Sequence, residues 1–189
     1  MELLLESEFD PNGTNQFGNT PLMESALAFE QNQSDLIKIL NLHSQLPSDK
    51  FELGKSLKQT NKMGKNFLNI LAIRNFSNVL RNILEASNSK DREEYLNQVD
   101  PGGWNLFSEA VFHGSYEVVK CFVDANYVKK EWLDFESRNY GNLVDMCQYG
   151  LEYGRPNSQL LKLIIFNQFE KFNLEAKQSS KKVMARKAH

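Results

Sequence analysis

The stretch Gly18-Asn-Thr-Pro-Leu-Met-Glu-Ser-Ala26 decides the fold of this chain. Proline suits the first turn of a helix, because its φ is already helical and its missing N–H has no partner there. Leu22 and Ala26 lie four residues apart and therefore share one helix face. A second apolar stripe follows in Asp35-Leu-Ile-Lys-Ile-Leu40. Together the two stretches predict a pair of short helices whose apolar faces meet.

The same pattern returns three more times along the chain. The turn residue recurs at positions 18, 64, 103 and 139, at intervals of 46, 39 and 36 residues. Two apolar stripes follow each later turn, in the segment pairs Gly64–Ala72 and Asn78–Leu84, Gly103–Val111 and Glu117–Val123, and Asn139–Cys147 and Gln159–Ile165. Self-similarity at a period of about 20–50 residues is typical of stacked repeats. The predicted unit is helix, loop, helix and long loop.

The unequal intervals indicate insertions. They follow the first and second repeats, near 41–60 and 87–98, and the carboxylates of the second are interpreted as a solvated loop. The turns between helices are longer near 31–34 and 149–158, whereas Asn75 marks a short one.

These motifs resemble a known family, the ankyrin repeat. Gly18-x-Thr-Pro-Leu-x-x-x-Ala26 is similar to the family signature of a glycine turn followed by Thr-Pro-Leu, and Gly103–Val123 keeps the family spacing throughout. The opening Leu3–Asn12 resembles the end of a preceding repeat. The resemblance implies an all-α, ankyrin-type helix–loop–helix solenoid of about four to five repeats with insertions.

We therefore expect one ankyrin repeat domain over residues 1–173, followed by a basic flexible tail at 174–189. The expected repeats lie near 15–46, 61–88, 100–130 and 136–170, with a partial repeat at 1–14. The last helix is predicted at Gln159–Phe172, with a polar outer side that caps the open end of the stack. This polar side consists of Gln168, Glu170, Lys171 and Asn173.

A repeat stack has a continuous core, because each helix pair buries its apolar face against its neighbours. Apolar and small residues at matching offsets are the predicted core: Leu22, Ala26, Leu36, Ile37, Leu40, Leu68, Leu71, Ala72, Val79, Leu80, Ile83, Phe107, Ala110, Val118, Val119, Phe122, Leu143, Cys147, Leu160, Leu161 and Ile164.

The resemblance also implies a binding surface. In the family, residues around the turn glycine and late on the first helix line a concave face. The matching candidates for partner binding are Phe17, Asn19, Met63, Lys65, Arg74, Trp104, Phe112, His113, Arg138, Tyr140 and Tyr149, with Leu27, Ile73 and Gln148 beside them. Exposed aromatic, Met and Arg side chains are typical of interaction hot spots. We predict that Phe17, Trp104, Phe112, Tyr140 and Tyr149 form a line that binds a protein segment. The alternative is that these rings pack back onto neighbouring repeats.

Nothing in the sequence predicts an enzyme. His43, His113 and His189 lack the spacing of metal ligands. Cys121 and Cys147 occupy predicted core positions, where a thiol behaves as a small hydrophobic group. No glycine-rich phosphate-binding motif occurs. We expect no catalytic residue, no metal, no cofactor and no small-molecule substrate.

The composition and the charge pattern of the chain favour some classes of partner and some cell compartments over others. Among 189 residues, 41% are hydrophobic and 24% are charged, with a formal net charge of −2, which disfavours nucleic acid as a partner. The most apolar run, Leu160–Phe166, is far shorter than the ~20 residues of a membrane span. The acidic start lacks the features of a signal peptide. The prediction is a cytoplasmic protein with no membrane span. The basic cluster Lys181–Lys187 is either a solvated tail or a nuclear import or anionic contact site.

The predicted function is a non-catalytic protein–protein interaction module that acts as an adaptor, inhibitor or scaffold. Divergent repeats rich in Asn, Lys, Phe and Gln are similar to ankyrin proteins of intracellular bacteria and large viruses, which act on host proteins. The cytosol of a host cell is then the expected location. The alternatives are a targeting or regulatory domain of a larger enzyme and a nucleic-acid contact through the tail.

Overall fold

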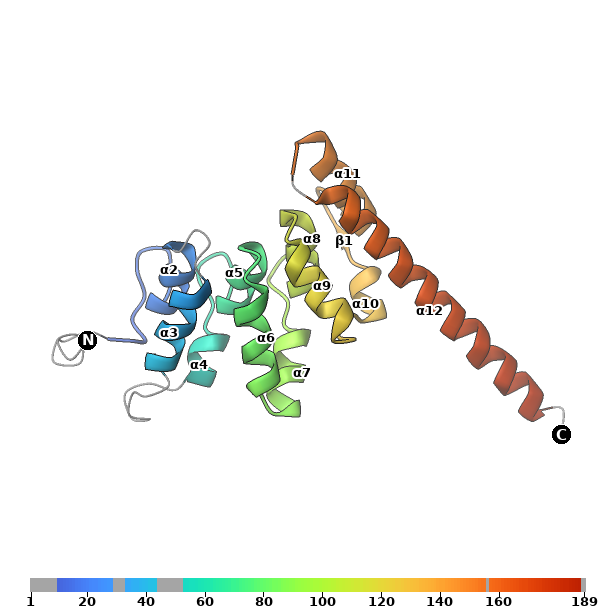
Figure 1. The fold of residues 1–189 in the computed structure, drawn as a ribbon, viewed down its shortest axis with the longest axis horizontal. Helices are drawn as coiled ribbons and strands as arrows, with labels where there is room; N and C mark the ends of the chain where they lie inside the picture. The colour runs from blue at the N-terminus through green and yellow to red at the C-terminus, as the bar shows by residue number, and fades with distance from the viewer. Residues whose placement is uncertain (1–9, 29–32, 44–52, 156, 188–189) are drawn as a thin grey trace. The chain divides into compact units, whose positions relative to one another are not determined.

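The computed structural model describes residues 10–28, 33–43, 53–155 and 157–187; for Leu42, His43 and residues 175–187 it describes the backbone alone. The chain divides into two compact units, Met1–Leu106 and Phe107–His189. The described residues are mostly helical (Figure 1). Residues 1–9 of the predicted partial repeat, residues 44–52 of the first insertion and His189 lie outside the described residues.

The described part of the first unit contains two helix pairs and two extra helices. The pairs are α2 (Pro21–Ala28) with α3 (Gln33–His43), and α5 (Phe67–Ile73) with α6 (Ser77–Ala86). Helix α2 packs on α5 and α3 packs on α6, so the two pairs stack side by side (Figure 1). The extra helices are α4 (Leu53–Lys58) and α7 (Ser89–Asn97).

The second unit contains two further pairs. They are α8 (Leu106–His113) with α9 (Tyr116–Asp124), and α11 (Leu143–Glu152) with α12 (Ser158–Lys187). Between the pairs lie α10 (Lys130–Leu133) and the two-residue strands β1 (Glu136–Ser137) and β2 (Gly141–Asn142). The strands are antiparallel, with Glu136 opposite Asn142 and Ser137 opposite Gly141. This pairing is the only strand structure among the described residues.

Most predicted core positions are buried, and the exceptions have a simple cause. Ile37 and Ile83 are half-buried on α3 and α6, the second helices of their pairs. On α12 the predicted phase is wrong: Leu160 is 47% exposed and Ile164 is half-buried, while Leu161 and Ile165 are fully buried. The buried face of this helix is therefore rotated by about one residue from the predicted stripe.

The turn before each first helix, which we call the finger turn, has one hydrogen-bond pattern in the first three repeats. An Asn or Asp side-chain oxygen accepts the backbone N–H groups two and four residues later, and its backbone N–H donates to the carbonyl at the fourth residue. The accepting residues are Asn15, Asn61 and Asp100. The glycines three residues later, Gly18, Gly64 and Gly103, have φ of 78°, 75° and 81°, which only glycine adopts without strain.

The fourth finger turn differs from the prediction. The sequence alignment placed the turn residue at Asn139, but the left-handed residue is Gly141, with φ of 68°. Asn142 caps α11 by accepting the N–H groups of Val144 and Asp145. In the second repeat, Gly64 lies two residues before the N-cap residue of its helix, Asn66. Tyr140 lies two residues before the N-cap residue Asn142, so it occupies the place that glycine has in the other turns.

The predicted insertion loops contain helices. Lys58 of α4 pairs with two carboxylates of α7, at 2.8 Å from Glu94 and 3.6 Å from Asp91. Tyr95 and Leu96 of α7 are buried. The hydrogen bond to Glu94 raises the pKa of Lys58, and burial raises the pKa of Tyr95. The loop interpretation of residues 87–98 is wrong, because two apolar side chains are enough to anchor a nine-residue helix once another helix is present to cover them.

Helix α12 also departs from the sequence prediction. It runs to Lys187 rather than ending at Phe172. Its residues beyond 172 contain no Gly or Pro, so nothing in the chain terminates the helix. Gln168, predicted on the polar side, is 9% exposed, whereas large apolar residues are exposed on this helix: Leu160, Leu163, Phe166 and Leu174.

Candidate functional site

Two apolar side chains stand at the tips of neighbouring finger turns in the first unit. Phe17 and Met63 lie two residues after Asn15 and Asn61, and they are 60% and 73% exposed. The Lys62 N–H donates to the Phe17 carbonyl over 3.0 Å, which joins the two turns. Both residues were predicted to contact a partner, and the structure leaves both open to one.

Asn19, by contrast, is buried and is not exposed for contact with a partner. It is 8% exposed, and its amide donates to Glu24 Oε1 over 2.7 Å. Its oxygen accepts from Asn61 Nδ2 over 2.8 Å. Asn19 thus ties the first finger turn to α2 and to the second turn, so its predicted role in partner binding is replaced by a structural one.

Lys65, Trp104 and Arg74 are half-buried. Lys65 Nζ lies 2.6 Å from Asp100 Oδ2 and 5.8 Å from the centroid of the Trp104 ring. The two charged side chains of the pair are 14% and 7% exposed. The Lys65–Asp100 pair and Trp104 join the second and third finger turns, and only part of the indole is exposed to solvent.

Three predicted residues of the second unit come together in one aromatic cluster. The ring centroid of Phe112 lies 4.6 Å from that of Tyr140 and 6.1 Å from that of Tyr149, and the two tyrosines are 5.2 Å apart. The cluster includes a ring that the sequence analysis missed, Tyr153, which stacks on Tyr149 at 4.3 Å and is 68% exposed.

Arg155 completes this cluster. Its guanidinium carbon lies 4.0 Å from the centroid of Phe112 and 5.3 Å from that of Tyr149. It also donates to the Phe112 carbonyl. Gly154, with φ of 67°, ends α11 and returns the chain so that the Arg155 N–H reaches the carbonyl of Gly150 over 2.7 Å. The repeat pattern could not find Arg155 or Tyr153, because both lie in the longer turn near 149–158, which has no counterpart in the other repeats.

The remaining predicted residues lie near this cluster in sequence but differ in role. His113 is exposed; its ring lies edge-on to Phe112 at 5.2 Å, and its Nε2 is 3.7 Å from Glu109 Oε2. Arg138 is exposed on the turn between the strands. Of the neighbouring positions, Leu27 and Gln148 are exposed and Ile73 is half-buried.

A hollow of about 380 Å³ opens beside the two tyrosines of this cluster. It is lined by Asn139, Tyr140, Gly141, Asp145, Gln148, Tyr149 and Glu152. Residues 145, 148, 149 and 152 follow the spacing of one helix face, so α11 offers this side to the hollow. Its other side is buried, and α11 packs on α12. The hollow thus combines two aromatic rings, two carboxylates and two side-chain amides.

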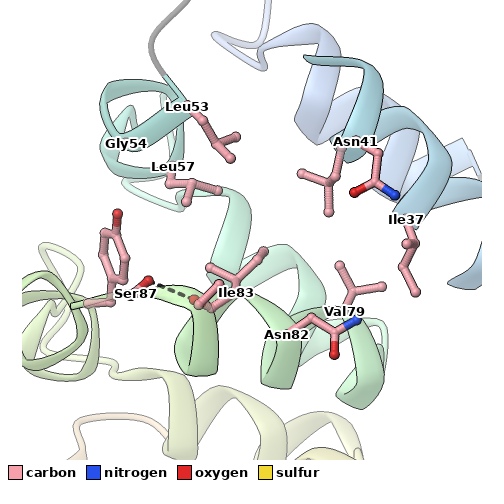
Figure 2. Close-up of a pocket in the computed structure, with 12 residues that line it drawn as sticks. Ile37, Asn41, Leu53, Gly54, Leu57, Val79, Asn82, Ile83 and Ser87 are labelled. Atoms are coloured by element: carbon pink, nitrogen blue, oxygen red, sulfur yellow. Dashed lines mark hydrogen bonds between the residues drawn. The ribbon is translucent and has the colours of Figure 1, made fainter. Parts of the chain in front are cut away.

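A second hollow, of about 320 Å³, lies between α3, α4 and α6 in the first unit. In Figure 2, Leu53 and Leu57 of α4 face Ile83 of α6, with Ile37 and Asn41 of α3 opposite. Its lining contains no Asp, Glu, Lys, Arg or His. It therefore lacks a charged group that would orient a ligand, and it lies beside α3 and α6 rather than at the predicted surface.

Metal ligands and thiols are the remaining candidates for chemistry among the described residues. No three His, Cys, Asp or Glu side chains among them are grouped so as to hold a metal ion. Burial raises the pKa of Cys147 to about 12, which keeps its thiol protonated and unreactive. In the described part of the chain, no helix is both long and apolar enough to cross a membrane.

Comparison with known proteins settles the fold. No family model matches the sequence, and no curated protein sequence matches it. The crystal structure of EF0377, an ankyrin repeat protein, matches with a TM-score of 0.59. This chain has the ankyrin repeat fold. The match covers 88% of this chain and 72% of EF0377 at 16% sequence identity, so the likeness concerns the fold alone. The family resemblance inferred from Gly18–Ala26 and Gly103–Val123 is confirmed at that level, as is the mostly helical architecture.

Proposed function

We propose that this ankyrin repeat chain binds another protein through its finger turns and the inner helices that follow them. The ankyrin fold is in general a protein-binding module, which supports the broad class. The observation that carries the proposal is the exposure of Phe17 and Met63 at equivalent positions of neighbouring finger turns.

The third finger turn shows that the fold needs no side chain at this position. The equivalent residue there is Gly102, and the turn forms with the same hydrogen bonds. Two large apolar side chains that stay in water contribute little to the stability of the turns that carry them. Contact with a partner accounts for them, because apolar and aromatic anchors contribute most of the binding energy at protein interfaces.

The aromatic cluster of the second unit supports the same function. Tyr153 is 68% exposed, and Tyr140 and Tyr149 are half-buried beside an open hollow. Tyrosine provides a large amphipathic contact area with few rotatable bonds, which suits a binding surface.

Selection from a phage-displayed library of natural protein segments tests this proposal. The full chain is the bait, and binding of the enriched segments is then measured for the double variant Phe17→Ser/Met63→Ser. We expect this variant to weaken binding by about tenfold or more for segments that use the finger tips. Leu163→Ser is the matched control, because Leu163 of α12 is similarly exposed, at 54%, and lies outside the proposed surface.

Equal loss of binding in the control, or undiminished binding in the double variant, would contradict the proposed surface. Circular dichroism of each variant checks that the helical fold is retained.

We extend the proposal to a partner from a host cell, encountered in the cytosol. The support is the composition of the divergent repeats, which is similar to that of ankyrin proteins of intracellular bacteria and large viruses. Parallel selections from a library of the source organism and a library of its host test this extension. Enrichment confined to the first library would contradict it.

A further inference from the structure

We infer that the hollow on α11, lined by Tyr140, Asp145, Gln148, Tyr149 and Glu152, binds an arginine or lysine side chain of the partner segment. The inference rests on the proposed function and names the chemistry of one contact within it. It follows from the aromatic walls, the charge of the lining and the behaviour of a guanidinium that the cluster already holds.

The aromatic walls are Tyr140 and Tyr149, whose ring centroids are 5.2 Å apart at an interplanar angle of 65°. Both rings are half-buried, so each keeps part of its surface open toward the hollow. Aromatic rings attract cations within about 6 Å of their centroids, and the attraction grows when the cation is partly desolvated. A hollow of about 380 Å³ has room for one long basic side chain.

The lining also carries negative charge. Asp145 and Glu152 are its two charged residues, and the other lining residues are neutral. Asp145 uses one carboxylate oxygen, Oδ2, to accept the Asn142 N–H over 3.0 Å. Glu152 is exposed and forms no ion pair within the described part of the chain. A carboxylate at the rim gives a bound cation a charge-assisted hydrogen bond.

Three basic side chains lie near the hollow, and none lines it. Arg155 is held by the Phe112 carbonyl and by two rings. Lys162 of α12 donates to Gln148 Oε1 over 3.2 Å. Arg138 is exposed on the neighbouring turn. A partner segment that binds here is therefore expected to carry acidic or neutral groups beside its basic residue. The lining itself stays negative.

Arg155 provides an internal example of the same recognition. Its guanidinium lies 4.0 Å from the centroid of Phe112 and 5.3 Å from that of Tyr149, so this ring cluster already holds a cation. Tyr149 thus belongs both to the site occupied by Arg155 and to the wall of the hollow. A second guanidinium or an ammonium group from a partner would find the same type of ring together with the carboxylates that Arg155 does not use.

The test is a selection from random twelve-residue peptides displayed on phage, with the full chain as bait. The enriched peptides are then measured against the double variant Asp145→Asn/Glu152→Gln. Asn at position 145 keeps an oxygen that can accept the Asn142 N–H, so α11 retains its cap. The matched control is Glu117→Gln/Glu131→Gln, which removes two exposed carboxylates from the same unit.

We expect enriched peptides with an invariant Arg or Lys whose affinity falls about tenfold in the double variant and stays unchanged in the control. A synthetic peptide with citrulline in place of its arginine keeps the shape but loses the charge, and it should also bind about tenfold more weakly. The affinity of the wild-type chain for the arginine or lysine peptide should also fall when the salt concentration is raised from 50 to 500 mM.

Two outcomes would overturn the inference, and they are distinguishable. If peptides depend on Phe17 and Met63 but show no basic residue and no response to the carboxylate variant, the basic contact is wrong and the proposed function stands. If no peptide responds to either set of variants, both are wrong.

Discussion

The first three finger turns and the fourth reach similar backbone paths by different means. In the first three, a single Asn or Asp side chain organises the turn and glycine takes the left-handed position. In the fourth, Ser137 Oγ accepts a single N–H, from Asn139 at 3.4 Å, and a two-residue strand pair closes the turn. Tyr140 stands where the other turns have glycine.

This difference shows how a change in one finger turn brings aromatic side chains together. Where the turn is held by buried hydrogen bonds, its residues are committed to the fold, as Asn19 and Lys65 are. Where the left-handed residue moves to Gly141, Tyr140 is released to join Phe112 and Tyr149. The aromatic cluster is obtained with fewer side-chain hydrogen bonds in the turn.

The largest expected effect contrasts Asp100 with Ser137. Asp100→Ala should lower the free energy of unfolding by about 3–4 kcal/mol, because it leaves Lys65 without its carboxylate and removes the acceptor of two backbone N–H groups. Ser137→Ala should cost less than about 1 kcal/mol, since it removes one long hydrogen bond. Urea unfolding followed by circular dichroism measures both.

Asp100→Asn separates the two contributions of Asp100. It keeps an oxygen for the backbone N–H groups and removes the charge, so about half of the loss should remain. Equal costs for Asp100→Ala and Ser137→Ala would contradict the contrast between the third and fourth turns.

The next effect compares the left-handed glycines of two turns. Gly64→Ala places a Cβ against the rigid ring of Pro101 at φ of 75°, and we expect a cost of about 3 kcal/mol. Gly141→Ala meets the side chain of Asp145, which can rotate away, so about 1–2 kcal/mol is expected. Thermal unfolding of the two variants gives the difference.

Gly154→Ala calibrates this pair. No atom lies within 4 Å of the added Cβ, so the substitution reports the backbone strain alone, about 1 kcal/mol. If Gly64→Ala costs no more free energy of unfolding than Gly154→Ala, the clash with Pro101 is removed by a small shift of the backbone or of the proline ring.

The smallest effect concerns the pH dependence of the fourth repeat. Burial raises the pKa of Cys147 from 9.0 to about 12, so between these values the unfolded chain loses the thiol proton while the folded chain keeps it. The contribution of this thiol to stability is therefore present below pH 9 and is lost as the pH rises. Between pH 9 and 10.5 the wild type should lose about 1–2 kcal/mol more than Cys147→Ala.

Denaturant unfolding of both proteins at several pH values checks this prediction. Parallel curves for the wild type and Cys147→Ala would show that the thiol is not buried in this way.

Local pattern explains why so much of the fold could be predicted. Turn glycines, helix stripes and the turn at Asn75, whose φ is 59°, depend on residues a few positions apart. Of the five rings predicted to form a line, Phe112, Tyr140 and Tyr149 lie together, because they come from two neighbouring repeats of the second unit.

Long-range partners explain what could not be predicted. Asn19 was wrongly assigned to the surface. Its partner Asn61 lies 42 residues away in sequence, so the local pattern does not reveal the hydrogen bond between them. The helix at Ser89–Asn97 depends on α4, which supplies Lys58 to its carboxylates. Arg155 and Tyr153 joined the aromatic cluster through the turn at Gly154, which the repeat pattern does not contain.

The amino-acid sequence by itself determined the repeated helix pair, since glycine marks the turn of the first three pairs and apolar side chains at helical spacing mark all four. Only the tertiary structure decided which conspicuous side chains are open to a partner. Phe17 is exposed and Asn19 is buried, although they are two residues apart, because exposure depends on what a neighbouring repeat places against each side chain.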